Sequence, residues 1–304
     1  MNFCITVLGS SAALPTATRQ CSSQVISLEG YKMLIDCGEG TQNQIRKFRI
    51  KFQSIDDIFI SHLHGDHFYG LPGLLSSMHM CGRTEPINIY APKGIKEILD
   101  NLFALTGVYI NYELRYHELE GNEPMLLMEN DKCKVTAFPL IHSVPTYGFL
   151  IEEQPALPNL KPGVRNTYNL TNADIVSIKQ GNDFLTDDGR VIPSSVLTKP
   201  AKPSVKYAYC CDTLYSEAIL PHISGVDLLC FDCTFDASMD AVADEKLHGT
   251  TQSAATAAKM ADAKQLMLTH FSARYGDVEP LVDEAKTIFP NTFAATDGLR
   301  IDLK

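Results

Sequence analysis

Apolar and polar positions divide most of this chain into short β-prone runs separated by stretches with helical spacing. An apolar run that ends at a turn or a polar cluster predicts a strand. Strands are expected at residues 3–8, 24–28, 32–36, 58–61, 87–90, 132–138, 206–211, 227–231 and 264–269. Helices are expected at residues 38–48, 71–80, 93–105 and 250–263, the last with Thr250 or Thr251 as its N-cap. Because the two kinds of element alternate in both halves, the pattern predicts an α/β layered fold.

The stretch from Glu152 to Lys206 departs from this pattern. It holds six of the chain's 16 prolines, and one short helix is expected within it at residues 172–179. Its charges nearly balance, with seven Lys and Arg against six Asp and Glu. We interpret residues 1–304 as a single domain and residues 152–206 as an arm inserted into it. A solvated insertion and a binding arm are both compatible with this composition.

The bulk composition is that of a soluble globular protein, with 45% hydrophobic and 20% charged residues. No apolar run approaches the roughly 18 residues of a membrane span, so no contact with a membrane is expected. The nine cysteines are scattered and odd in number, which favours free thiols in a reducing cytoplasm. Cys210 and Cys211 are interpreted as small core residues.

The net charge of −10 argues against a generally basic surface of the kind that binds nucleic acid. It does not exclude a local one. Residues 46–51, Arg-Lys-Phe-Arg-Ile-Lys, form a compact basic run shortly before the histidine cluster at residues 62–67. Two interpretations stay open: a solvated helix end, where cations suit the helix dipole, or a surface that contacts phosphates.

Candidate metal ligands are concentrated just after the strand expected at residues 58–61. His62, His64, Asp66 and His67 place three imidazoles and one carboxylate within six positions. A single histidine usually caps, packs or hydrogen-bonds without a metal, but this density is typical of a hydrolytic zinc site.

Three further candidate ligands also follow predicted strands: His142, Asp212 and His270. Since open sheets collect their chemistry at the carboxyl ends of strands, these side chains are expected to meet the first cluster. Seven ligands are enough for two zinc ions, with one aspartate bridging them. Two such metals clamp the attacking and leaving oxygens of a phosphoryl transfer.

Several motifs together resemble the ribonuclease Z family of the metallo-β-lactamase superfamily. The HxHxDH signature at residues 62–67 is shared by the superfamily, whereas the block Leu-Thr-His-Phe-Ser-Ala-Arg-Tyr at residues 268–275 is more specific to this family. Other matching segments are residues 8–10, 15–16, 36–42, 70–75, 211–213 and 247–251. The resemblance covers nearly the whole chain.

The resemblance implies a fold, an activity and a ligand set. The fold would be a four-layer αβ/βα metallo-β-lactamase sandwich with an inserted arm, the arm being a candidate tRNA-binding exosite. The activity would be an endoribonuclease that removes the 3′ trailer from precursor tRNA, working as a homodimer. Two Zn²⁺ per subunit are implied, with Mn²⁺ or another divalent metal as the alternative. One metal would take His62, His64 and His142, the other Asp66, His67 and His270, and Asp212 would bridge them.

The same resemblance assigns catalytic roles. Asp66 would orient or deprotonate the attacking water, and His248 would protonate the leaving 3′ oxygen with an acidic partner to orient it. Here that partner would be Asp232, where relatives have a glutamate, and Phe231 stands where they have a histidine. The arm also lacks a clear Gly-Pro pattern at its tip.

Two other functions stay open on the sequence alone. One is a phosphodiesterase of this fold that acts on a small-molecule ester, and the other is a nucleic-acid-binding subunit with an inactive site. The presence of every proposed ligand weighs against the second.

Gly38 and Gly40 also have two interpretations: backbone donors to phosphate at a helix start, or a tight strand-to-helix turn.

Overall fold

The computed structural model describes residues 3–303 and divides into two compact units. The larger unit comprises Met1–Glu152 and Val205–Lys304, and the smaller one is Glu153–Ser204. Residues 1, 2 and 304, which the single-domain interpretation included, lie outside the described residues.

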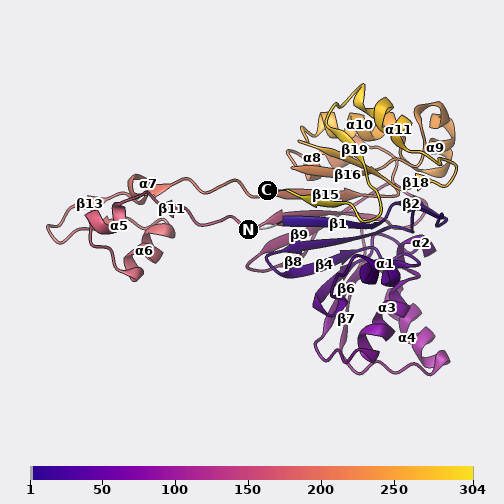
Figure 1. The fold of residues 1–304 in the computed structure, drawn as a ribbon, viewed down its shortest axis with the longest axis horizontal. Helices are drawn as coiled ribbons and strands as arrows, with labels where there is room; N and C mark the ends of the chain where they lie inside the picture. Colours follow the sequence, from indigo (N-terminus) through magenta and orange to yellow (C-terminus); the bar gives the residue numbers. More distant parts are fainter. Residues whose placement is uncertain (1–2, 304) are drawn as a thin grey trace. The chain divides into compact units, whose positions relative to one another are not determined.

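The larger unit contains two seven-stranded sheets (Figure 1). The first has the order β20 (Arg300–Asp302), β1 (Phe3–Gly9), β3 (Ser23–Leu28), β4 (Tyr31–Ile35), β5 (Ile55–Phe59), β6 (Ile87–Pro92) and β7 (Leu114–Leu119). The second has the order β19 (Thr292–Ala294), β17 (Leu266–Thr269), β16 (Leu228–Asp232), β15 (Lys206–Cys210), β10 (Tyr147–Glu153), β9 (Cys133–Pro139) and β8 (Met125–Glu129). Two short strands, β2 (Ser11–Ala12) and β18 (Phe271–Ser272), pair in parallel beside them.

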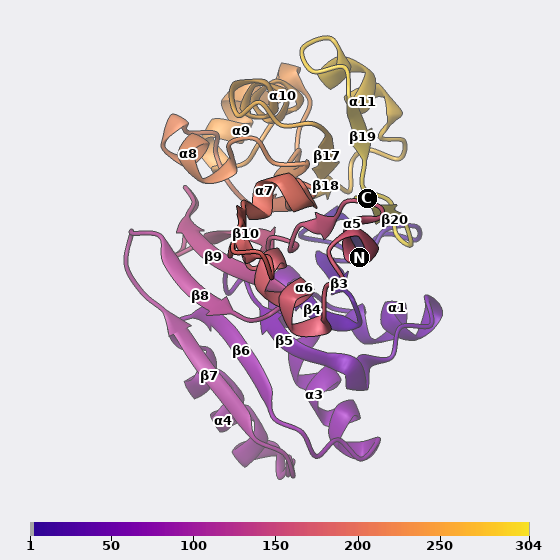
Figure 2. The ribbon, with the colours of Figure 1, turned by 90° about the vertical axis from the view of Figure 1, so that its left-hand side faces the viewer.

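Helices cover the outer faces of both sheets, so the larger unit has four layers, as the family resemblance implied (Figures 1 and 2). On the first sheet lie α1 (Thr41–Lys47), α3 (Leu71–Met80) and α4 (Ile95–Thr106). On the second lie α8 (Leu220–Ile223), α10 (Thr251–Met260) and α11 (Glu279–Lys286). Two other helices are α2 (Gly65–Phe68) and α9 (Asp240–Lys246), and short 3₁₀ turns lie at Phe52–Ser54, Glu217–Ile219 and Ala237–Met239.

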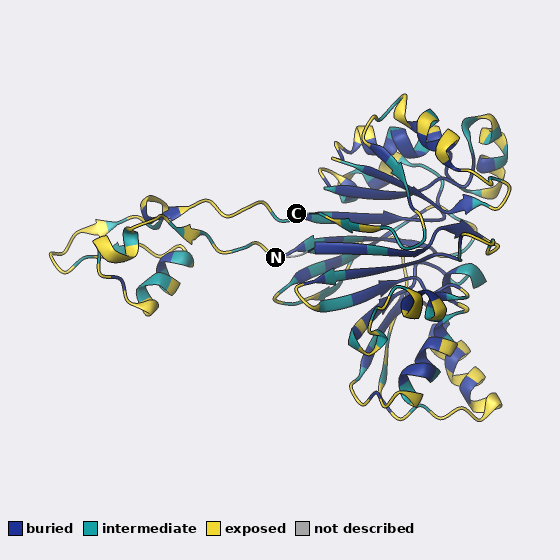
Figure 3. Ribbon diagram, viewed as in Figure 1, coloured by how far each residue is buried: buried dark blue, intermediate teal, exposed yellow. Residues whose placement is uncertain are grey.

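The core follows from strand alternation. Phe3, Ile5 and Val7 of β1 point between the sheets, where they meet Tyr207 and Tyr209 of β15 in one apolar cluster. Two further clusters lie between each sheet and its helices, and the strands between layers are accordingly buried (Figure 3). Burial on both faces explains why these strands read as nearly continuous apolar runs.

Local signals set the helix boundaries closely. Helix α3 occupies the predicted residues, and Thr250 caps α10 through a capping box with Ser253. Helix α4 begins two residues later than predicted because Gly94, with φ of 105°, serves as its N-cap.

The smaller unit is a folded module with its own core. It contains α5 (Val164–Thr167), α6 (Asn172–Lys179) and α7 (Ser194–Leu197), with the strand pairs β11 (Asn159–Leu160) with β14 (Thr198–Lys199) and β12 (Phe184–Leu185) with β13 (Val191–Ile192). Leu170, Ile178 and Leu197 are buried at its centre. Helix α6 matches its predicted bounds and starts with a capping box from Thr171 to Asp174.

All nine cysteines are free, as predicted, and eight of them are buried. Within residues 3–303, no helix combines the length and apolarity that crossing a bilayer requires.

Candidate functional site

The predicted site residues converge at one edge of the two sheets. Strand β5 leads into His62, β15 into Asp212 and β17 into His270. Strands β15, β16 and β17 are parallel neighbours, so their carboxyl ends lie side by side. This arrangement explains why ligand-type residues far apart in the sequence meet in space.

The buried carboxylate of Asp212 lies at the centre of the cluster. Its Oδ2 is 3.3 Å from His62 Nε2 and 3.7 Å from His142 Nε2. Its Oδ1 is 2.8 Å from His270 Nε2 and 3.3 Å from His67 Nε2. Each oxygen therefore faces a different pair of imidazoles, which is the geometry of a bridging carboxylate.

Three overlapping sets of donor atoms include Asp212, and the atoms of each set lie within 4.8 Å of one another. The first comprises His62, His64, His142 and Asp212; the second His67, Cys211, Asp212 and His270; the third Asp212, Asp232, His248 and His270. His62 Nε2 is buried without a hydrogen-bond partner among the described residues. An orphaned nitrogen aimed at a carboxylate suits a metal ligand, and imidazole with carboxylate is a donor set that divalent metals accept.

Asp66 lies beside the second set. Its Oδ2 is 3.4 Å from His270 Nε2 and 3.5 Å from His67 Nε2. The backbone N–H of Ala13 donates to the same oxygen at 2.8 Å. Burial opposes ionisation of Asp66, but hydrogen bonds from His270 and His67 outweigh it and hold the pKa of the carboxyl below its ordinary value. The site therefore offers a charged, partly exposed carboxylate.

His248 and Asp232 form a hydrogen-bonded pair next to the first two sets. His248 Nδ1 is 3.0 Å from Asp232 Oδ2, and Asp232 is fully buried at the end of β16. Thr213 and Thr234 donate backbone N–H groups to the two oxygens of Asp232 at 3.1 and 2.8 Å. The aspartate thus reaches the imidazole directly.

Each of several ligand-type histidines has a second partner that sequence reasoning missed. His67 Nδ1 is 2.7 Å from Asp36 Oδ2, and His270 Nδ1 is 2.9 Å from Thr234 Oγ1. His142 Nδ1 is 3.1 Å from the carbonyl oxygen of Leu247. Such partners fix the ring orientation and leave the other nitrogen free to bind a metal.

Asp36 is the most connected of these partners. It accepts from the Tyr209 hydroxyl at 2.8 Å and from the Ser61 backbone N–H at 2.7 Å. Asp36 directly follows β4, which ends at Ile35, but the strand expected at residues 32–36 included it, so its role was not predicted.

The backbone is in the left-handed region at several site residues. Asp36, Asp212 and His270 have φ of 54°, 54° and 62°, and Leu247, which precedes His248, has φ of 58°. Such conformations are costly for residues with a side chain, and they cluster at functional sites. Here Asp36, Asp212 and His270 follow strand ends and enter the cluster with their own side chains, whereas Leu247 ends α9 directly before His248.

Burial and the Asp212 carboxylate act in opposite directions on the pKa values of the buried imidazoles. Burial lowers the pKa of His62 to about 4, helped by the nearby His67, so His62 is a neutral donor. Burial also opposes the charged forms of His67 and His270, but Asp212 outweighs it and raises their pKa values well above normal. The carboxylate therefore attracts positive charge to its Oδ1 side, where a bound cation would replace those protons.

Glycines near the cluster are required by close backbone approach. A Cβ on Gly38 would lie 2.2 Å from the Asp66 carbonyl oxygen, and one on Gly249 would lie 2.2 Å from that of Asp232. The Gly38 N–H donates to Ser22 at 3.1 Å, and Gly40 has φ of 84°. These contacts favour the tight-turn interpretation over a role as phosphate donors.

Cys210 and Cys211 are buried, as expected of core residues. The Sγ atom of Cys211 also contacts the site, because it lies 3.4 Å from Asp212 Oδ1.

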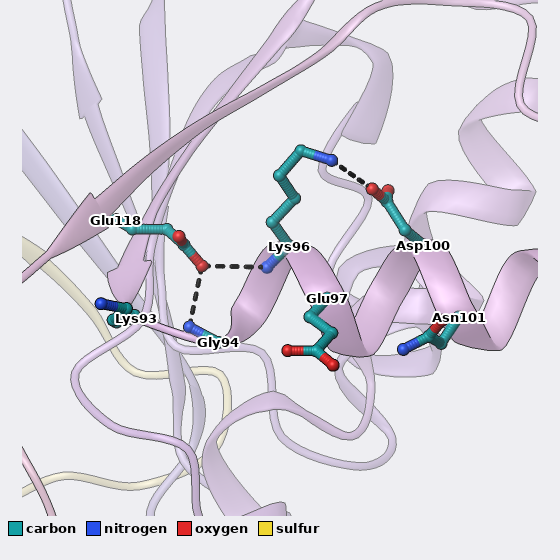
Figure 4. A pocket seen from close by; sticks show the side chains of 7 residues that line it. All are labelled: Lys93, Gly94, Lys96, Glu97, Asp100, Asn101 and Glu118. Carbon is teal, nitrogen blue, oxygen red and sulfur yellow. Dashed lines mark hydrogen bonds and ion pairs between the residues drawn. The ribbon is translucent and has the colours of Figure 1, made fainter.

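A different cavity, of about 390 Å³, opens at the start of α4 (Figure 4). Its charges neutralise one another: Lys96 pairs with Asp100, and Glu118 accepts from the backbone N–H of Gly94 at 2.8 Å. This cavity holds none of the predicted site residues, so it does not compete with the histidine cluster as the reaction site.

Comparisons with known proteins agree with this geometry. The chain is 41% identical over 297 residues to ribonuclease Z of Bacteroides thetaiotaomicron, covering 98% of this chain and 94% of that relative. The short form of human tRNase Z has a similar structure, with a TM-score of 0.73, 29% identity and 99% of each chain covered. The metallo-β-lactamase fold protein YhfI from Bacillus subtilis shares the fold, with a TM-score of 0.71 and 20% identity over 99% of this chain and 100% of its own.

Residues 3–157 also match the family model of the anti-Pycsar protein Apyc1. That match stops just after β10, in the smaller unit and before Asp212, Asp232 and His270, whereas the ribonuclease Z relative matches 98% of this chain. The chain therefore belongs to the ribonuclease Z family, a group of metal-dependent endoribonucleases with the metallo-β-lactamase fold.

Proposed function

We propose that this protein removes the 3′ trailer from precursor tRNA by hydrolysing one phosphodiester bond. The observation that carries the mechanism is the placement of Asp212, whose two oxygens face separate imidazole pairs. The ribonuclease Z relatives and the tRNase Z structure support the substrate.

Two zinc ions per subunit fit these residues best. His62, His64 and His142 would hold one and Asp66, His67 and His270 the other, with Asp212 shared between them. When bound, the metals would supply an activated water and charge stabilisation for the attacking and leaving oxygens. Mn²⁺ is the alternative, because carboxylate and imidazole donors accept it as well.

The protein's own side chains would then move the protons. Asp66, charged and partly exposed beside the second set, would orient the attacking water and accept its proton. His248 would donate a proton to the leaving 3′ oxygen, and the hydrogen bond between its Nδ1 and Asp232 would fix the orientation of the ring. Cleavage in this sense leaves a 3′ hydroxyl on the tRNA and a 5′ phosphate on the trailer.

The smaller unit is the proposed tRNA exosite of a homodimer. Its buried core gives it a defined shape, and Lys161, Arg165 and Lys179 provide cations on it. We further propose that the arm of one subunit holds the tRNA for the site of its partner. A reducing cytoplasm, where free thiols persist, suits both the substrate and the nine free cysteines.

Removing the carboxylate of Asp66 tests the hydrolytic assignment. Asp66→Ala should lower kcat on precursor tRNA by at least about 100-fold, because the attacking water loses its base. Product mapping after incubation with zinc, and then with manganese, should show cleavage after the discriminator base by the unsubstituted protein only. Circular dichroism controls for folding. Unchanged turnover by the variant would refute the assignment, and cleavage of a simple phosphodiester without any cleavage of tRNA would favour a small-molecule phosphodiesterase.

His248 should matter only where the leaving oxygen needs a proton. His248→Ala is expected to slow precursor tRNA cleavage by about 10²–10⁴-fold while largely sparing bis(p-nitrophenyl) phosphate, whose leaving group departs without protonation. His79→Ala, at a partly exposed histidine outside the cluster, serves as the matched control. Equal losses on both substrates would contradict the proton-donor role.

Asp36 should act through His67 on metal affinity. Asp36→Asn is expected to raise the Kd for zinc by about 10–100-fold, because the ring of His67 loses its anionic partner. Competition with a chromogenic chelator measures this, and Asp131→Asn, at an exposed carboxylate, is the control. A Kd equal to that of the control would remove Asp36 from the site.

The arm can be tested by deletion, because β10 and β15 are antiparallel neighbours with Glu152 opposite Lys206. A short turn replacing residues 153–204 should raise the KM for precursor tRNA while bis(p-nitrophenyl) phosphate is still hydrolysed. Mixing this variant with Asp66→Ala subunits should restore tRNA cleavage if arms work across a homodimer. No restoration would contradict action between subunits, and an unchanged KM would contradict the exosite.

A further inference from the structure

Residues 48–51, the second part of the basic run, line a groove that the proposed mechanism does not use. The groove has a volume of about 390 Å³ and lies on the helix-bearing face of the first sheet, against β1, β3 and β4. Four of its lining residues are cationic and come from separate parts of the chain: Lys32, Arg49, Lys51 and Arg300. None of the described residues that line it is acidic.

These charges form few close ion pairs, although Asp56 lies near enough to Lys32 to interact with it electrostatically. Among residues 3–303, no carboxylate forms an ion pair with Lys32, Arg49 or Lys51. Arg300 approaches Asp302 at 3.6 Å, but its side chain remains 61% exposed. In a chain with a net charge of −10, such a grouping creates a local positive potential. The cavity at α4 differs, because its lysines are paired with neighbouring acids.

The backbone places Arg49 in the groove at an energetic cost. Helix α1 ends in a Schellman motif, in which Ile50 N–H donates to Ile45 at 2.9 Å and Arg49 N–H to Arg46 at 3.1 Å. Arg49 occupies the left-handed position of this motif, with φ of 57°, where glycine is usual. The chain thus carries a cation where a residue without a side chain would be more stable.

The groove is connected to the reaction site within the larger unit. Gly298 lines the groove, and its neighbour Asp297 accepts from Ser10 Oγ at 3.2 Å and Gln20 N–H at 2.8 Å. The loop between Ser10 and Gln20 contains Ala13, which donates to Asp66. Along this path the separation is on the order of 20 Å, from the rise of a strand and the reach of an extended loop.

We propose that this groove binds the phosphate backbone of the RNA substrate a few nucleotides from the bond that is cut. This inference rests on the proposed function and adds a second contact surface to it, on the larger unit rather than the arm. The cations neutralise phosphates, and Phe48, whose ring packs where a Cβ of Gly298 would be, gives the groove an apolar wall against ribose.

The test compares charge removal in the groove with equal charge removal elsewhere. Arg49→Gln/Lys51→Gln should raise the Kd for precursor tRNA about tenfold near 0.1 M salt and reduce the slope of log K against log salt by about 2. Lys93→Gln/Lys96→Gln, at the α4 cavity, is the matched control and should change neither quantity. Hydrolysis of bis(p-nitrophenyl) phosphate, which is too small to span both places, checks the reaction site.

Arg49→Gly separates binding from folding. It should raise the Tm, because glycine relieves the left-handed strain, and yet weaken RNA binding. If Arg49 had only a structural role, the substitution would not raise the Tm and weaken RNA binding at the same time.

If the groove variants match the control in Kd and in salt slope, the proposal is overturned. It is also overturned if the groove variant loses a dimer that the unsubstituted protein forms in sedimentation, because the groove would then bind a second copy of the chain. If the unsubstituted protein neither binds nor cuts precursor tRNA, the proposed function fails first. That result differs from normal cleavage of precursor tRNA combined with groove variants whose binding equals that of the control, which overturns the groove proposal alone.

Discussion

The structure of the site depends on one buried carboxylate that must serve two sets of imidazoles at once. Asp212 lies at the end of β15 with one oxygen toward His62 and His142 and the other toward His67 and His270. A buried anion needs compensating charge, and protons on imidazoles or bound cations are the means available here. Parallel strand ends, left-handed turns and buried second partners all act to hold this arrangement.

The layered fold explains why such an arrangement is stable. Core clusters on both faces of each sheet fix the strands, so the strained residues at their ends are held by the surrounding structure. Asp36 shows the coupling most clearly, because it joins Ser61 and His67, which follow β5, to Tyr209 of β15. The rigidity of the scaffold is thereby passed to the ligands.

Much of this was predictable from sequence, since strand period and ligand type at strand ends are local signals. The α/β layers, helix α3 and the convergence of His62 and Asp212 follow from them. The partners of the ligands were not predicted, because a hydrogen bond such as Thr234 to His270 depends on tertiary placement. The basic run at residues 46–51 had two interpretations, and only the neighbouring strands revealed that Arg49 and Lys51 share a groove with Arg300.

The central claim is that Asp212 bridges two metals in an RNA-cleaving site. Anomalous difference density from crystals of the active protein, recorded at the zinc absorption edge, tests it most directly. The account predicts two peaks about 3.5–4 Å apart, one on each side of the Asp212 carboxylate. A single peak, or none, in a preparation that still cleaves precursor tRNA would contradict it.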